Sequence, residues 1–225
     1  MSTTSILPGR RSTAVLLVAA AVLELAETLI SPLRGGSTSS ELGLVAAHEG
    51  RFTVSVLCGM AAVLMYGPGF LGLAGSCASR TPWLARFAGW TAAVSMTAFF
   101  GVRGIQAVQL AAVRQGLDHH TAAKVIDAVG ANPLGITVLV LFLGGAVVGT
   151  VSLAVATWRA GLPKVAAVLL GIFQFVDLAL PGHLGTVLSH ALLLVALAWF
   201  ATYLWTPSTD TAKPEPAPAA ATHSA

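Results

Sequence analysis

The chain has 225 residues, of which 56% are hydrophobic and only 9% are charged, and its formal net charge at pH 7 is +3. Soluble domains carry about 25% charged residues, so this composition excludes an ordinary soluble enzyme and predicts a protein that crosses a membrane several times. The basic residues form no cluster interleaved with aromatic side chains, and we therefore expect no nucleic-acid partner.

Six segments are apolar over the length of about 20 residues that one membrane crossing requires. They cover residues 13–31, 50–74, 83–113, 135–158, 163–181 and 184–205. The sequence therefore predicts an all-α polytopic membrane protein, a bundle of about six transmembrane helices within residues 13–205. A short segment, 1–12, precedes this domain, and we expect the Pro- and Ala-rich tail, 206–225, to be disordered.

The positions of the Lys and Arg residues predict the orientation of the bundle. If the amino terminus is cytoplasmic, seven basic residues lie on the cytoplasmic side and four lie outside. The cytoplasmic ones are Arg10, Arg11, Arg80, Arg86, Arg159, Lys164 and Lys213. Because cytoplasmic loops of membrane proteins are enriched in Lys and Arg, we expect both termini in the cytoplasm of a multi-pass cell-membrane protein.

Three short motifs predict details of the helices. Gly145 and Gly149 have the small-xxx-small spacing that lets two membrane helices pack closely. Tyr66-Gly67-Pro68-Gly69 should kink or break the second span, because proline removes a helical hydrogen bond. In the long connection before the fourth span, Thr121 is a candidate N-cap of a short amphipathic helix.

Polar and ionisable residues inside the predicted spans fall at one level, in the outer half of the bundle. Glu24 and Glu27 are three residues apart, as are Gln174 and Asp177, so each pair shares one helix face. A carboxylate inside a membrane is costly unless a cation or a proton neutralises it. We therefore expect a polar pocket that opens toward the outer leaflet, with Arg103 as the partner of Glu24 or Glu27.

Acid and aromatic side chains together predict a particular chemistry for this pocket. A carboxylic acid that an apolar site keeps protonated can donate a proton to an alkene, and aromatic faces stabilise the resulting carbocation. The candidate catalytic acids are Glu24, Glu27 and Asp177. The candidate substrate-binding residues are Trp90, Phe99, Phe100, Arg103, Gln106, Phe173, Gln174 and His190.

In its size, its helix count and its scattered intramembrane acids, the chain resembles the small integral-membrane terpene cyclases of actinobacterial biosynthetic clusters. The resemblance covers residues 13–205. It implies a proton-initiated, non-redox cyclisation of a prenyl chain attached to a polar group, with neither a metal nor another cofactor. The expected partners are a lipophilic prenylated small molecule and membrane lipid, and the chain could form a homo-oligomer.

Three other functions fit the same residues. A subunit of a small-molecule or proton-coupled transporter would use the acids and histidines as a proton relay. A haem- or quinone-binding protein would need histidines that face each other across helices, and His48, His183 and His190 have suitable depth. In a non-catalytic scaffold the polar layer would only hold the helices together. We predict no metal site, because the adjacent pair His119 and His120 lies in a loop.

Overall fold

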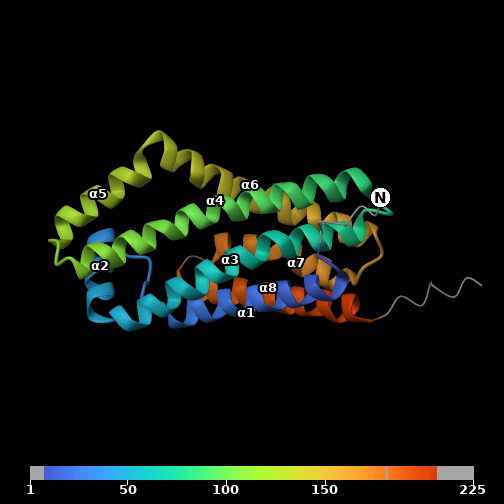
Figure 1. Ribbon diagram of the computed structural model, residues 1–225, viewed down its shortest axis with the longest axis horizontal. Coiled ribbons are helices and arrows are strands. Elements are labelled where there is room, and N and C mark those ends of the chain that lie inside the picture. Colours follow the sequence, from blue (N-terminus) through green and yellow to red (C-terminus); the bar gives the residue numbers. More distant parts are fainter. Residues whose placement is uncertain (1–7, 181, 207–225) are drawn as a thin grey trace, which may run out of the picture.

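The structure is a computed structural model that describes residues 8–180 and 182–206, and within these residues it is all-α, with no strand. The helices are α1 (Arg10–Ile30), α2 (Thr38–Ala47), α3 (Glu49–Cys77), α4 (Pro82–Arg114), α5 (His119–Ala131), α6 (Pro133–Arg159), α7 (Lys164–Ala179) and α8 (His183–Trp205) (Figure 1). From position 207 onward, the predicted tail lies outside the described residues.

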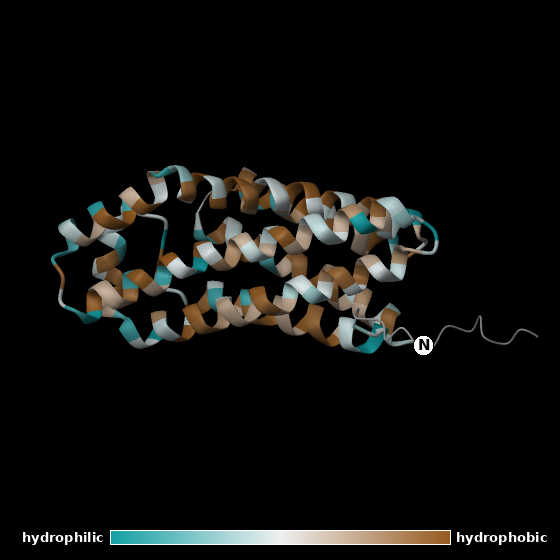
Figure 2. Cartoon of the chain, turned by 45° about the horizontal axis from the view of Figure 1, so that its top comes forward, coloured by the Kyte–Doolittle hydropathy of each residue, from teal (hydrophilic) through white to brown (hydrophobic). Residues whose placement is uncertain are grey.

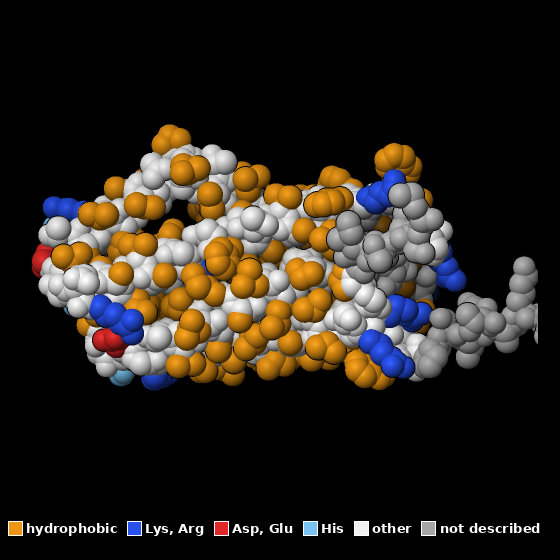
Figure 3. Space-filling view, viewed as in Figure 1, with side chains coloured by type: hydrophobic (Ala, Val, Ile, Leu, Met, Phe, Trp, Pro, Cys, Tyr) orange, Lys and Arg blue, Asp and Glu red, His pale blue; other side chains and the backbone are white. Residues whose placement is uncertain are grey.

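Five of these helices, α1, α3, α4, α6 and α8, are long and apolar enough to cross a membrane. Hydrophobic residues run along the bundle in Figure 2, and hydrophobic side chains cover the flank of the molecule in Figure 3. The prediction of a helical membrane protein is thus confirmed. The fifth predicted span corresponds to α7, whose 16 residues reach about 24 Å at about 1.5 Å per residue, short of the roughly 30 Å hydrocarbon core.

Six helices form a closed ring in the order α1, α3, α4, α6, α7 and α8, and α8 packs back against α1. Both described ends of the chain lie at one end of this ring, where Arg10 donates a hydrogen bond to the carbonyl of Tyr203 at 3.3 Å. The α3–α4 and α6–α7 turns meet at the same end, because Arg80 donates to the carbonyl of Ala160 at 2.8 Å. We call this the terminal end.

At the opposite end, α2 and α5 pack against each other. Thr38 on α2 donates a hydrogen bond to Asp127 on α5 at 2.6 Å, and Leu42 packs with Ile126 in a small apolar cluster. The N-cap of α5 is Asp118, whose carboxylate accepts hydrogen bonds from the backbone N–H and the hydroxyl of Thr121. These bonds lower the pKa of Asp118 below its ordinary value. Thr121 therefore lies inside the first turn of α5, and its assignment as the cap was wrong.

Small residues allow α4 and α6 to approach closely, as the glycine spacing predicted. A Cβ atom at Gly149 would lie 2.8 Å from the backbone nitrogen of Ala92, and one at Gly145 would lie 2.9 Å from the Cβ of Ser95. α3 continues as one helix from Glu49 to Cys77, with Pro68 inside it. The sequence pattern allowed a break at this proline, and the helix is not broken there.

The apolar core fills the terminal half of the ring. Its fully buried side chains come from all six ring helices and include Leu17, Leu73, Leu153, Leu170 and Phe200. Toward the α2–α5 end, polar side chains replace them on the inner helix faces. A cavity opens where this replacement occurs.

Candidate functional site

The cavity lies inside the ring and has a volume of about 470 Å³, within the range of about 300–1,000 Å³ typical of small-molecule sites. Each of the six ring helices contributes to its wall. The polar side chains are Glu24, Glu27, Thr28, Ser31, Arg34, Tyr66, Arg103, Gln106, Thr150, Gln174, Asp177, His183, Thr186, Ser189 and His190, and the other aromatic ones are Phe70, Phe99, Phe142 and Phe173. Gly35 and Gly182, which lie between helices, also line it and mark the side toward the α2–α5 end.

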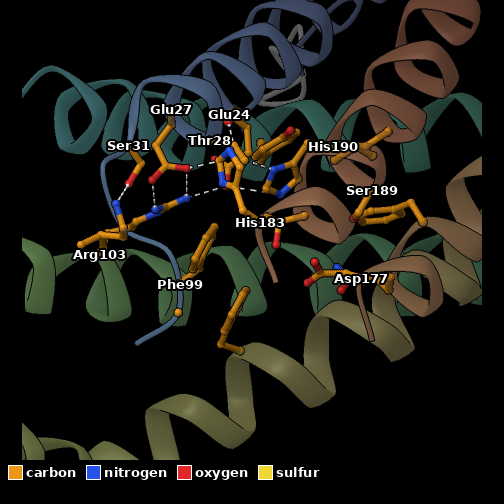
Figure 4. A pocket seen from close by; sticks show the side chains of 18 of the residues that line it. Glu24, Glu27, Thr28, Ser31, Phe99, Arg103, Asp177, His183, Ser189 and His190 are labelled. Carbon is orange, nitrogen blue, oxygen red and sulfur yellow. Dashed lines mark hydrogen bonds and ion pairs between the residues drawn. The ribbon is translucent and has the colours of Figure 1, made fainter. Parts of the chain in front are cut away.

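A buried ion cluster forms one wall of the cavity. Arg103 Nη2 lies 2.6 Å from Glu24 Oε1, and Arg103 Nη1 lies 2.8 Å from Glu27 Oε1 (Figure 4). The three side chains are only 3–7% exposed. The predicted pairing of Arg103 with one of the two acids is confirmed, and the structure extends it to both. Two carboxylates therefore share one guanidinium, which leaves this cluster with a formal charge of −1.

The remaining contacts of Arg103 fix its orientation. Its Nη1 also donates to Gln106 Oε1 at 3.1 Å, and its guanidinium carbon lies 4.6 Å from the centroid of the Phe99 ring. Phe142 on α6 stacks on Phe99 with centroids 4.2 Å apart and an interplanar angle of 5°. Arg103 and Phe142 thus occupy the two faces of this ring. Phe99 positions the guanidinium and offers no free face to a ligand.

Gly59 on α3 gives the guanidinium the room that it needs. A Cβ atom at this position would lie 3.0 Å from both Cζ and Nε of Arg103 and 3.2 Å from Cγ of Glu27. These separations are tighter than an ordinary van der Waals contact, so only glycine fits without displacing the ion cluster. Sequence reasoning missed Gly59 because it lies in an apolar helix of another span, and only the packing of α3 on α1 and α4 shows its role.

His190 joins α8 to the cluster through Thr28. The Nδ1 atom of His190 lies 2.7 Å from Thr28 Oγ1, and its Nε2 lies 3.8 Å from Glu24 Oε1. The Thr28 hydroxyl also lies 3.0 Å from the Glu24 carbonyl, to which it can donate its single hydrogen. In that arrangement the hydroxyl accepts from Nδ1–H of His190, and the Nε2 edge faces the Glu24 carboxylate. Thr28 shares the helix face of Glu24, which is the sequence signal for its role.

Three buried polar atoms of this wall have no hydrogen-bond partner among the described residues. They are Glu24 Oε2, Arg103 Nε and the hydroxyl oxygen of Tyr66. Buried polar groups in native proteins are nearly always satisfied by protein, water or ligand. The two oxygens come from adjacent helices, and both residues line the cavity.

The α7 wall carries the third carboxylate. Asp177, Gln174 and Phe173 line the cavity from this helix, and Asp177 is partly exposed there. Within residues 8–180 and 182–206, Asp177 makes no hydrogen bond or ion pair. Figure 4 shows it apart from the Arg103 cluster, with no dashed line reaching it. The predicted pairing of Gln174 and Asp177 on one face is confirmed.

Comparison of the chain with protein-family models, with curated proteins and with solved structures finds no match.

Two of the predicted substrate-binding residues do not lie at the cavity. Trp90 and Phe100 are 65% and 40% exposed on the outside of α4, and Trp90 lines a separate shallow groove between α4 and α6. The reason is helical phase. Phe100 is turned by about 100° from Phe99, and the nine residues from Trp90 to Phe99 make about two and a half turns, which puts Trp90 on the opposite face.

The polar residues at the start of α3 also lie elsewhere. Glu49 pairs with Arg114 at 2.7 Å on the exposed surface at the α2–α5 end, and His48 lies between α2 and α3. The two histidines that do line the cavity, His183 and His190, both belong to α8. Among the described residues, no group of three or more His, Cys, Asp or Glu side chains could hold a metal ion.

Proposed function

We propose that the protein binds a lipophilic molecule with a prenyl chain in this cavity and cyclises the chain by proton transfer from Asp177. The supporting observation is the contrast among the three acids that line the cavity. Glu24 and Glu27 both accept hydrogen bonds from Arg103, whereas Asp177 has no such partner among the described residues. Asp177 is therefore the acid that can carry a proton to a ligand. Phe173 lies one turn away on the same helix face.

The proposed reaction begins when the O–H of Asp177 gives its proton to the terminal alkene of the prenyl chain. A C–H bond forms, and the adjacent carbon becomes a tertiary carbocation, which an internal alkene attacks to form a ring C–C bond. Loss of a proton from the carbon next to the final cation, back to the Asp177 carboxylate, leaves a new alkene. The product is an isomer of the substrate, so no oxidant or reductant is consumed.

Aromatic side chains would stabilise the positive charge while the ring forms. Phe173, Phe70 and Tyr66 line the cavity, and the rings of Tyr66 and Phe70 are stacked with centroids 5.3 Å apart. An aromatic face attracts a cation through its quadrupole, most strongly where water is excluded. In this proposal Glu24, Glu27 and Arg103 do not transfer the proton; they form the polar wall that orients the substrate.

The proposal includes an orientation in the membrane. We infer that α7 also enters the bilayer, which gives six membrane helices, and that the terminal end is cytoplasmic. The support is the set of basic residues at this end, which are Arg10, Arg11, Arg80, Arg86, Arg159 and Lys164. Cytoplasmic loops are enriched in such residues. The cavity then opens toward the outer leaflet, from which a membrane-dissolved substrate can enter.

A second candidate function is proton-coupled transport, and the contact of His190 with the ion cluster favours it. A histidine 3.8 Å from a buried carboxylate can exchange protons with that carboxylate during a transport cycle. The two candidates differ in outcome, because a cyclase changes the covalent structure of its ligand and a transporter does not.

The test uses purified protein in lipid nanodiscs with a panel of farnesylated phenols, indoles and amines. We expect the wild type to form products of unchanged mass and new chromatographic position, and to add one deuterium when the reaction runs in D₂O. Asp177→Asn removes the general acid and should therefore lower turnover by about 10²–10⁴-fold. Asp127→Asn, at an exposed position on α5, should match the wild type. Wild-type turnover in Asp177→Asn, or the absence of isomerised products with the whole panel, would overturn the proposal.

A further inference from the structure

We propose that Glu24 and Tyr66 form a head-group subsite in the cavity and that the head group they bind is a protonated amine. The inference rests on the proposed function in one respect, which is that the cavity holds a lipophilic ligand. It adds the chemical class of the polar end of that ligand. The prenyl chain would extend from this subsite across the cavity toward Phe173 and Asp177 on α7.

Two buried oxygens of the subsite need a hydrogen-bond donor. Glu24 and Tyr66 are 2% and 3% exposed, and Glu24 Oε2 and the Tyr66 hydroxyl have no hydrogen-bond partner among the described residues. Both residues line the cavity. A carboxylate oxygen only accepts hydrogen bonds, and a phenol oxygen accepts as well as donates. A ligand that satisfies both must therefore bring N–H or O–H hydrogens.

The charge of the ion cluster favours a cationic head group. Glu24 and Glu27 face the single guanidinium of Arg103, so the ion cluster has a formal charge of −1. At a buried site an unbalanced charge is unfavourable and attracts a counter-ion. A protonated amine supplies the missing positive charge and the N–H hydrogens together. An alcohol supplies only the hydrogen.

The contacts of Arg103 disfavour an anionic head group, such as a phosphate or carboxylate, beside Glu24. The four Nη hydrogens of Arg103 are matched by four bonds, one to Glu24, two to Glu27 and one to Gln106. Its Nε is buried beside the backbone of Gly59. The Nη groups of Arg103 therefore have no hydrogen left for an anion beside Glu24. The other arginine that lines the cavity, Arg34, is exposed in the connection after α1, where its Nη1 donates to the carbonyls of Ser31 and Leu33 at 2.9 Å. An anionic head group here would meet carboxylates at close range.

The aromatic pair beside the subsite suits the same ligand. The ring of Tyr66 stacks on Phe70 at an interplanar angle of 10°, which fixes the orientation of both rings. Carbon atoms next to an ammonium nitrogen share its positive charge and are attracted to aromatic faces. The subsite thus pairs a hydrogen-bond acceptor with an aromatic surface.

The test measures equilibrium binding of three probes with the same chain: radiolabelled farnesylamine, farnesol and farnesoate. Wild-type protein is held in nanodiscs of zwitterionic lipid, and empty nanodiscs correct for partition into the lipid. At neutral pH farnesylamine is protonated and farnesoate is ionised. We expect farnesylamine to bind at least about tenfold more tightly than farnesol, and farnesoate not to compete with it.

Two variants assign the effect to the subsite. Glu24→Gln should remove the preference for the amine over the alcohol. Because this change could disturb folding, Tyr66→Phe provides a milder test that keeps the stacked ring and deletes only the hydroxyl, and it should weaken farnesylamine binding several-fold. Glu49→Gln, at an exposed carboxylate of α3, is the matched control and should bind all three probes as the wild type does.

Equal binding of the amine and the alcohol to the wild type, an unchanged amine preference in well-folded Glu24→Gln, or unchanged farnesylamine binding in Tyr66→Phe would overturn this inference. The cyclase proposal can fail or hold independently of this binding result. If the amine preference depends on Glu24 but no prenylated substrate is isomerised, the cyclase proposal fails and the subsite stands. If isomerisation depends on Asp177 but the amine has no advantage, the subsite fails and the cyclase proposal stands.

Discussion

Arg103 is expected to contribute more to the stability of the bundle than the other ion-pairing residues of the described chain. The substitution Arg103→Met removes two nitrogens that lie 2.6 and 2.8 Å from the carboxylates of Glu24 and Glu27. Solvent compensates their loss only weakly, because the two carboxylate side chains are only 3% and 7% exposed. Removing one partner of a buried ion pair costs about 3–5 kcal/mol. Since Arg103 serves two carboxylates, we expect a loss near the upper value, about 5 kcal/mol.

A second arginine of α4 provides the matched control. Arg114 pairs with Glu49 at 2.7 Å, but these side chains are 51% and 44% exposed. Solvent screens such a pair, so Arg114→Met should cost no more than about 1 kcal/mol. Both free energies of unfolding can be measured in mixed micelles, by titration with a denaturing detergent and detection of helix content.

The outcome that would refute this reasoning is equal stability of the two variants. A further variant tests the cause of the loss. Adding Glu24→Gln and Glu27→Gln to Arg103→Met removes the uncompensated charges, so the triple variant should regain more than half of the lost stability. If it is no more stable than Arg103→Met, the loss comes from packing of the arginine side chain and not from charge.

Two other predictions concern local contacts. Gly59→Ala should destabilise the protein by about 1–3 kcal/mol, because its Cβ would press on Arg103. Gly104→Ala inside α4, where no atom of another helix lies within 4 Å of the new Cβ, should stabilise it by about 0.5–1 kcal/mol; the opposite order in the same micelle titration would contradict the packing. The lowered pKa of Asp118 means that its cap supports α5 above the ordinary value of 3.8 and is lost as pH falls through the lower folded-state value. Amide-exchange protection of α5 should therefore drop on acidification in the wild type but not in Asp118→Asn, and equal pH profiles would contradict the capping role.

The ion cluster could be predicted from sequence because its energetic cost is visible there. Glu24 and Glu27 in an apolar span require a neutralising partner, and Arg103 is the cation at a comparable depth. The helices were predictable for a similar reason, since each needs about 20 apolar residues to cross the membrane. Length and charge are properties of single segments, so one sequence is sufficient to read them.

The rotation of each helix about its axis could not be read in the same way. In a soluble protein the apolar stripe of a helix marks its buried face, but lipid and protein interior are both apolar. Phe99 and Phe100 look equivalent in the sequence, yet the first supports Arg103 and the second is exposed. Trp90 was misplaced for this reason. Gly59 and Tyr66 were missed because their roles depend on contacts between helices, which no single segment encodes.

The scaffold interpretation accounts for part of this cavity, and the remainder argues for a ligand. One carboxylate paired with Arg103 would be enough to hold α1 against α4. The chain instead places a second carboxylate on the same guanidinium, leaves the Tyr66 hydroxyl without a hydrogen-bond partner among the described residues, and puts Asp177 on the opposite wall. Each surplus polar group makes the fold less stable unless something satisfies it. A ligand with a positive head group and an apolar chain would satisfy the second carboxylate and the Tyr66 hydroxyl, and it would bring its chain to Asp177.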